Sequence, residues 1–214
     1  IDACLVGSEM CIRDSNCSGK HSGFLTLSRH LGAGSEYIDP AHPVQTLAKE
    51  AFQSMTETSD LGYAIDGCSA PNFATTVHGL SRAMSKMANP KLSTVRGKAA
   101  VRLVNAMTKH PDLVAGEGRA CTELMTAMDG KVAVKTGAEG VFIAILPEKG
   151  IGISLKITDG STRAAESAIT GLLVKYGALD VKHPIAQKHL NGPITNWRGV
   201  TTGEIKLNES FISI

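Results

Sequence analysis

Apolar residues recur every three or four positions along several stretches of the chain, a spacing that predicts amphipathic helices. One clear stripe consists of Val44, Leu47, Phe52 and Met55. The helices predicted in this way cover residues 18–31, 44–59, 72–88, 98–109 and 121–128. Their inward-facing residues include Phe73, Val77, Leu80, Met84 and Met87 in the third helix, and Val101, Leu103, Val104 and Met107 in the fourth.

After residue 131 the pattern changes from helical spacing to alternation, which predicts strands. Strand-like segments occupy residues 132–136, 140–146 and 151–157, with a turn at 147–150 that makes the last two a hairpin. Ser161 or Thr162 can cap a following helix that has Glu166 in its first turn and ends at Gly177. Short extended segments are expected at 63–71 and 200–206. The chain is therefore predicted to be α+β, or an α/β layer with a helical insert.

Composition restricts the class of protein. The 214 residues are 43% apolar and 20% charged, which is typical of a globular domain, and the net charge of +2 gives no reason to expect nucleic acid or a membrane surface as a partner. No apolar run is long enough for a membrane helix. The five cysteines are too few and too scattered for a disulfide framework, so a reducing compartment, the cytoplasm, is expected.

The first fifteen residues, IDACLVGSEMCIRDS, show neither a helical nor a strand period. The stretch from Cys4 to Ser15 resembles the translation of a sequencing adapter. Residues 1–15 are therefore interpreted as a non-native segment, and residues 16–214 as a partial domain that the native chain enters at Asn16.

Two short motifs contain cysteine beside a charged residue. In the motif from Asn16 to His21, Cys17 and Lys20 are three residues apart and would share a helix face, where a thiolate gains from the amine and from the helix N-terminus. In Asp66-Gly67-Cys68 a carboxylate precedes a thiol at a strand end. Simpler interpretations are a buried cysteine at a helix start and an Asx turn. Two thiols are not enough for a closed zinc site, so Lys20 or His21 would have to supply a third ligand.

A third motif, Lys135-Thr136-Gly137, is predicted on an edge strand next to the hairpin. In serine acyl-transfer enzymes of the penicillin-binding class, a Lys-Thr-Gly triad occupies this position, and its lysine polarises the site. The alternative is a surface lysine at a strand end.

Taken together, CSGKH at Cys17–His21, DGCSAPNFA from Asp66 and KTGAEGVF from Lys135 resemble the L-asparaginase II family, whose members are similar in fold to serine β-lactamases. The resemblance extends from Asn16 to about Ile205. It implies hydrolysis of the side-chain amide of L-asparagine, a small-molecule substrate, and a homodimer.

The resemblance also implies roles for individual residues. Cys17, Lys20 and Cys68 would hold one zinc ion. Asp66, beside the metal, would orient the charged α-amino group of the substrate, and Lys20 would also belong to the substrate-binding residues. Lys135 would be the catalytic lysine partnered to an active-site serine.

The sequence departs from the family pattern at the nucleophile. A Ser-x-x-Lys motif is expected upstream of Cys17, but residues 1–15 contain none, and neither Ser15 nor Ser18 has a lysine three residues later. The chain is therefore expected to lack the nucleophile and the N-terminal part of the fold, and to bind zinc without turnover. Two other hypotheses are a different β-lactamase-like serine amidase or esterase, which would not need the thiols, and a non-catalytic zinc-binding fragment.

Overall fold

The computed structural model describes residues 17–208 and 211, so the segment interpreted as non-native lies outside the described residues. The chain divides after Ala83 into two compact units, which are described separately. In the described residues no helix has both the length and the apolar character needed to cross a membrane.

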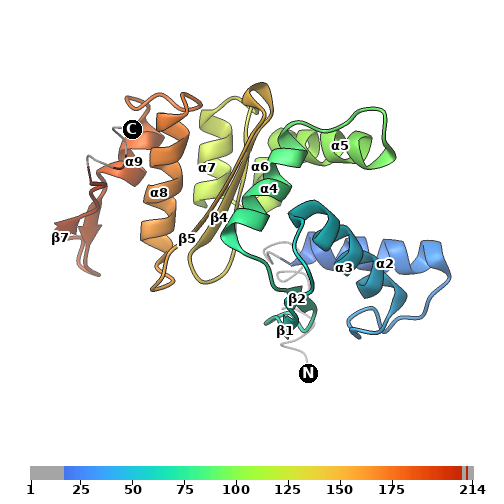
Figure 1. Ribbon diagram of the computed structural model, residues 1–214. Coiled ribbons are helices and arrows are strands. Elements are labelled where there is room, and N and C mark those ends of the chain that lie inside the picture. The colour runs from blue at the N-terminus through green and yellow to red at the C-terminus, as the bar shows by residue number, and fades with distance from the viewer. Residues whose placement is uncertain (1–16, 209–210, 212–214) are drawn as a thin grey trace. The chain divides into compact units, whose positions relative to one another are not determined.

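The first unit is built from two helices and a short hairpin (Figure 1). Its elements are α2 (Ser18–Leu31), α3 (Pro43–Thr56), β1 (Tyr63–Ile65), β2 (Pro71–Phe73) and the start of α4 (Val77–Ala88). The bounds of α2 agree with the prediction, and Gly32 ends the helix in the left-handed conformation that glycine adopts without strain. Strands β1 and β2 are antiparallel, with Ala64 opposite Asn72.

The helix predicted at 72–88 begins five residues later than expected. Pro71, Asn72 and Phe73 form β2, because the nonlocal pairing with β1 takes precedence over the apolar spacing. The hydroxyl of Thr76 accepts a hydrogen bond from the backbone N–H of Gly79 at 2.9 Å, and so caps α4 at its true start. Val77, predicted to face inward, is exposed.

The second unit is a three-stranded antiparallel sheet covered on both faces by helices. The elements before and within the sheet are α5 (Val95–Lys109), α6 (Pro111–Ala115), α7 (Ala120–Ala127), β3 (Ala133–Thr136), β4 (Val141–Leu146), the 3₁₀ turn η1 (Pro147–Lys149) and β5 (Ile151–Lys156). After the sheet come α8 (Thr162–Lys175), α9 (Pro184–Leu190), β6 (Pro193–Thr195) and β7 (Thr201–Glu204). The strand order is β3-β4-β5, which places β3 at an edge.

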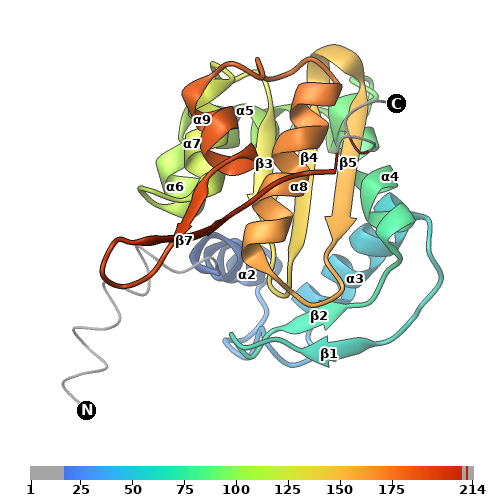
Figure 2. The same cartoon turned by 90° about the vertical axis from the view of Figure 1, so that its left-hand side faces the viewer.

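Alternating residues of the strands point to opposite faces of this sheet. On one face Val134, Phe142 and Ala144 pack with α7 and α8 in the main apolar core. On the other face Ala133 and Ile145 pack with Ala88 of α4 and Val104 of α5. Figure 2 shows α8 lying across the sheet. The α+β prediction is confirmed. In the second unit the sheet forms a layer with helices packed on it.

Several details of the second unit differ from the sequence prediction. Helix α5 starts at Val95, because the Thr94 hydroxyl caps it by accepting a hydrogen bond from the N–H of Gly97. Leu103, expected to face inward, is exposed. Ser161 caps α8 as predicted, but Glu166 lies beyond the first turn. The short elements α6, α9 and β6 were not predicted.

Candidate functional site

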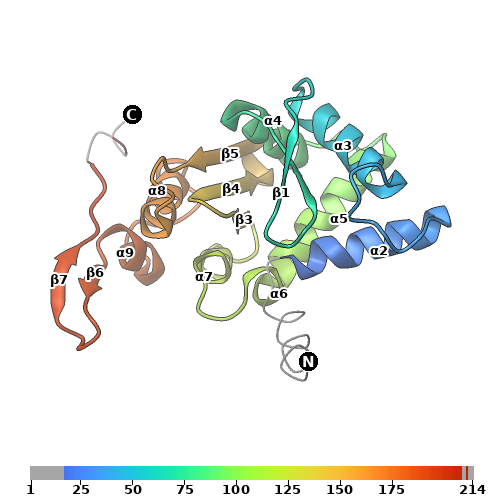
Figure 3. The ribbon, with the colours of Figure 1, turned by 90° about the horizontal axis from the view of Figure 1, so that it is seen from below.

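The start of α2 and the turn between β1 and β2 bring the two cysteine motifs together within the first unit (Figure 3). Cys17 is the residue that precedes α2, and its carbonyl accepts a hydrogen bond from the N–H of His21, which closes the first turn. Lys20 therefore lies about one turn from Cys17, as the helical spacing predicts.

The β1–β2 turn fixes the other half of the cluster. The N–H of Asp66 donates to the carbonyl of Ala70 at 2.9 Å, and the N–H of Ser69 donates to the carbonyl of Asp66 at 2.8 Å. Ser69 has a positive φ of 69°, which reverses the chain direction here. The Asp66 carboxylate accepts from the N–H of Gly67 at 2.8 Å. The carboxylate thus bonds to the next residue and not two residues on, so this is a backbone β-turn rather than the Asx turn of the simpler interpretation, and Cys68 is only half-buried and is not a core residue.

Residues far apart in sequence meet at the Asp66 carboxylate. Lys20 Nζ lies 3.3 Å from Asp66 Oδ2, and Cys68 Sγ lies 3.8 Å from the same oxygen. The sulfur atoms of Cys17 and Cys68 and a carboxylate oxygen of Asp66 all lie within 4.8 Å of one another. Two thiols and a carboxylate, with an amine beside them, form a donor set that can hold a soft divalent cation.

The two thiols of this cluster have different acidities. Burial raises the pKa of Cys17, and a hydrogen bond with Cys68 raises it further, so Cys17 stays protonated at neutral pH. Burial also acts to raise the pKa of Cys68, but the imidazole of His21, the backbone at Ala70, the amine of Lys20 and the thiol of Cys17 together lower it to about 7. Cys68 is therefore the thiol that is readily ionised.

Lys20 and Asp66 form a charged pair. Burial acts to lower the pKa of Lys20, but hydrogen bonds with Cys68 and Asp66 outweigh it and leave the pKa above its ordinary value. Hydrogen bonds from the N–H of Gly67 and from Lys20 hold the pKa of Asp66 below its usual range. At neutral pH, without a metal ion, Lys20 is an ammonium group and Asp66 a carboxylate.

Lys135 lies in the second unit, on the edge strand β3, opposite Ile143 of β4. Its Nζ donates to the carbonyl of Thr136 at 2.7 Å. The edge-strand position of the Lys-Thr-Gly motif is confirmed. That Lys135 shares a site with the two thiols stays a prediction.

One contact beside Lys135 was not anticipated from the sequence. Gly137 donates its N–H to Val141 of β4 at 2.8 Å, so the N–H of the preceding residue, Thr136, points away from β4. The fully buried Cys121 Sγ accepts this N–H at 3.1 Å. Burial raises the pKa of Cys121, so this cysteine is a neutral acceptor that covers the strand edge and not a reactive thiol.

The sequence profile of L-asparaginase II matches residues 6–207. The chain belongs to this family. The match begins within the segment interpreted as non-native, a prediction that no described residue tests. No curated protein matches the chain. Membership of the L-asparaginase II family makes the protein an amidohydrolase for which asparagine is the indicated substrate.

Proposed function

We propose that this chain contains the metal- and substrate-binding part of an L-asparaginase that hydrolyses L-asparagine to L-aspartate and ammonia through a serine–lysine acyl-enzyme mechanism. The observation that carries the proposal is the meeting of Cys17, Lys20, Asp66 and Cys68 in a member of the L-asparaginase II family. These four residues come from two segments, and local secondary structure alone gives no reason for them to cluster.

Zinc is the proposed cofactor, with Cys17, Lys20 and Cys68 as its ligands. The chemistry of the donor set supports this choice, because two thiolates and an amine suit a borderline-soft cation better than Mg²⁺ or Ca²⁺. Zinc bound here would supply positive charge that orients the substrate. The Lys20 amine would have to lose its proton in order to bind the metal, which would free Asp66 from its ion pair.

Asp66 is proposed to bind the α-ammonium group of asparagine. Its lowered pKa keeps the carboxylate ionised, and its half-buried position strengthens the attraction to a cationic group. Lys20 is proposed to contribute to substrate binding through Asp66, because its binding to the metal would release the carboxylate that it otherwise holds in an ion pair.

Lys135 is proposed to serve the chemical step. In that step a serine hydroxyl, activated by a lysine, attacks the side-chain amide carbon, and the C–N bond breaks as the serine proton is passed to the leaving ammonia. Water then hydrolyses the serine ester to aspartate. The ammonium group of Lys135 would stabilise the developing negative charge in both steps.

We also infer a fold like that of the serine β-lactamases. Two observations in the second unit support it: the Lys-Thr-Gly motif lies on the edge strand of an antiparallel sheet, and helix α8, which follows the sheet in the chain, packs on its face. The homodimer implied by the family resemblance stays a prediction.

The experiment that tests the proposal measures binding and turnover by the purified 214-residue chain. We expect one zinc ion per chain and measurable asparagine binding by calorimetry, and no ammonia release above a heat-treated control, because the expected Ser-x-x-Lys motif is not found in residues 1–16. Cys68→Ser should lower zinc affinity at least tenfold and weaken asparagine binding, since it removes a proposed ligand.

Cys11→Ser is the matched control, since it removes a thiol from the segment interpreted as non-native. Unchanged zinc and asparagine binding by Cys68→Ser would overturn the metal assignment and favour a serine amidase that does not use the thiols. Ammonia release by the unaltered chain would overturn the expectation that the nucleophile is missing.

A further inference from the structure

His21 follows Lys20 in the first turn of α2 and lies between aromatic rings. Its ring makes edge contacts with Phe24, at a centroid distance of 6.1 Å, and with Tyr37, at 5.6 Å. Its Nδ1 lies 3.0 Å from the hydroxyl oxygen of Tyr37, which is hydrogen-bonding distance. The orientation of the imidazole is therefore determined by packing and by one hydrogen bond.

The other ring nitrogen of His21 has no such partner. Nε2 is buried and makes no hydrogen bond within the described part of the chain. His21 bonds through its backbone N–H to the carbonyl of Cys17, whose sulfur lies within 4.8 Å of the sulfur of Cys68. Burial acts to raise the pKa of Cys68, and the nearby imidazole acts to lower it. A buried ring nitrogen without a hydrogen bond is unfavourable unless a bound group or a small movement satisfies it. The neighbouring sulfur of Cys68 is the group available for this.

The backbone of Tyr37 is itself held in place. Its backbone carbonyl accepts a hydrogen bond from Nε2 of Gln45 at 2.7 Å, and Gln45 is fully buried on α3. A side chain whose backbone is already held in place can orient a neighbouring group at a smaller cost in conformational entropy. The hydroxyl of Tyr37 is therefore preorganised relative to His21.

We propose that Tyr37 and His21 are positioning residues for Cys68: the Tyr37 hydroxyl donates to Nδ1 of His21, and the Nε2–H of His21 donates to the Cys68 sulfur. The proposal rests on the proposed metal site. When a metal ion holds Cys68 as a thiolate, the sulfur accepts hydrogen bonds and does not donate them, so the proton of a neutral imidazole must be on Nε2. Nδ1 is then an acceptor, and only the hydroxyl of Tyr37 can be the donor between them.

Residues that hydrogen-bond to metal ligands are known to change the affinity of the site for its metal, although they do not contact the metal themselves. Tyr37→Phe removes the hydroxyl and keeps the ring contacts, so it tests the hydrogen bond alone. We expect zinc affinity, measured by competition with a chromophoric chelator, to fall about tenfold or more. Tyr63→Phe is the matched control, since Tyr63 is exposed, lies in the same unit and also packs against an aromatic ring.

A second pair of variants tests the donor at His21. Gln can place an N–H near the position of Nε2, whereas Ala cannot, so His21→Gln should retain more zinc affinity than His21→Ala.

With cobalt(II) in place of zinc, the thiolate-to-cobalt absorption of Tyr37→Phe should keep its wavelength and intensity once the site is saturated, because the ligands are unchanged.

The possible outcomes separate the proposals. Zinc affinity of Tyr37→Phe within twofold of the unaltered chain overturns the positioning role and leaves the metal site standing. A changed cobalt spectrum in His21→Gln at saturation overturns the role as well, because it makes His21 a direct ligand. If the unaltered chain binds no zinc, both this proposal and the proposed metal site fail.

Discussion

Cys17 and Cys68 belong to the same cluster, yet their surroundings give them different acidities. The Cys17 side chain accepts no capping hydrogen bond from the N–H groups of α2, and burial raises the pKa of Cys17. Cys68 lies in a turn where an imidazole, an amine and a backbone group favour its thiolate. At neutral pH, Cys17 is therefore protonated and Cys68 is about half ionised.

This difference predicts how fast each thiol reacts in the metal-free protein. Alkylation requires the thiolate, so the rate at Cys68 should rise as pH increases and reach half its maximum at about pH 7. Cys17, with a raised pKa, should stay slow until the pH exceeds 9. Iodoacetamide labelling followed by mass spectrometry resolves the two sites. Equal rates at pH 7.5 would contradict the assignment.

The same acidities predict the number of protons that zinc releases. At pH 8 Cys68 is already ionised, whereas Cys17 and Lys20 still carry their protons. Binding to all three should therefore release about two protons at pH 8, and zinc affinity should increase with pH. Calorimetry in buffers of different ionisation enthalpy measures this number. Release of about one proton would show that Lys20 is not a ligand.

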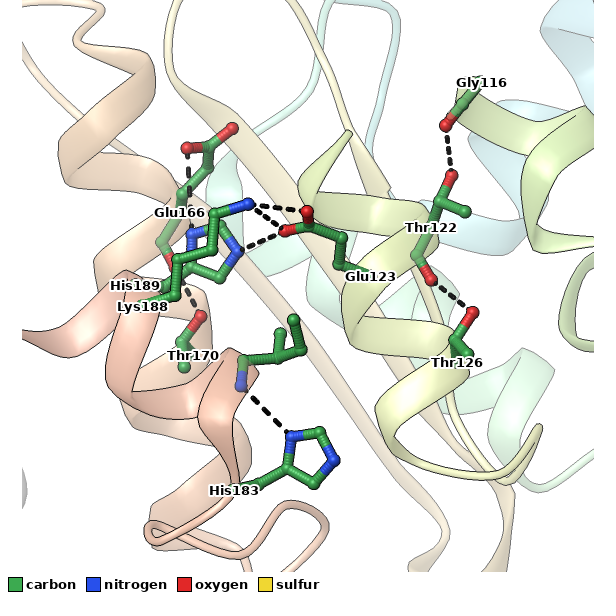
Figure 4. A network of polar contacts seen from close by, with 10 residues as sticks. Gly116, Thr122, Glu123, Thr126, Glu166, Thr170, His183, Lys188 and His189 are labelled. Carbon is green, nitrogen blue, oxygen red and sulfur yellow. Dashed lines mark hydrogen bonds and ion pairs between the residues drawn. The ribbon is translucent and has the colours of Figure 1, made fainter. Parts of the chain in front are cut away.

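At the scale of elements, a network of charged residues joins three helices of the second unit (Figure 4). Glu123 of α7 accepts from Lys188 of α9 at 2.7 Å and lies 3.2 Å from Nε2 of His189. Nδ1 of the buried His189 lies 4.0 Å from Glu166 of α8. The carboxylates of Glu123 and Glu166 face opposite nitrogens of the His189 ring. A single metal ion could therefore not be bound by the ring and by both carboxylates. The network is a clamp between helices.

Removing Glu123 from this clamp should destabilise the second unit. Glu123→Gln loses the ion pair with Lys188 and leaves His189 facing an amide, which should lower the free energy of unfolding by about 1–3 kcal/mol. Urea denaturation measures the change. Glu148→Gln is the control, because Glu148 is exposed on η1 and should change stability little. Equal stability of both variants would show that the clamp contributes nothing.

The elements also show where sequence reasoning succeeds. The apolar pattern places α2 and the strands of the sheet correctly, because that pattern is a local property. It also places α3, except that this helix ends at Thr56 and not at Ser59. It extended α4 over Pro71–Phe73 because the pairing of β2 with β1 is nonlocal. It did not find α9 or β6, which have seven and three residues and therefore contain too little of a period to recognise.

At the scale of the whole molecule, the candidate site depends on contacts between distant segments. Helical spacing predicts that Cys17 and Lys20 share a face, but the approach of Asp66 and Cys68 was expected only from the family resemblance. The support of His21 by Tyr37 could not be predicted, because it depends on how the connector between α2 and α3 folds back. Sequence pattern identified the reactive groups and not the residues that orient them.

The contact between Lys20 and Asp66, which are 46 residues apart, has a consequence for folding. Closing a loop of that length costs conformational entropy on the order of 3 kcal/mol. An ion bound by both segments would hold the loop closed, as a crosslink does, and α2, α3 and the hairpin would then unfold together. The metal would thus also determine the order in which this part of the chain assembles.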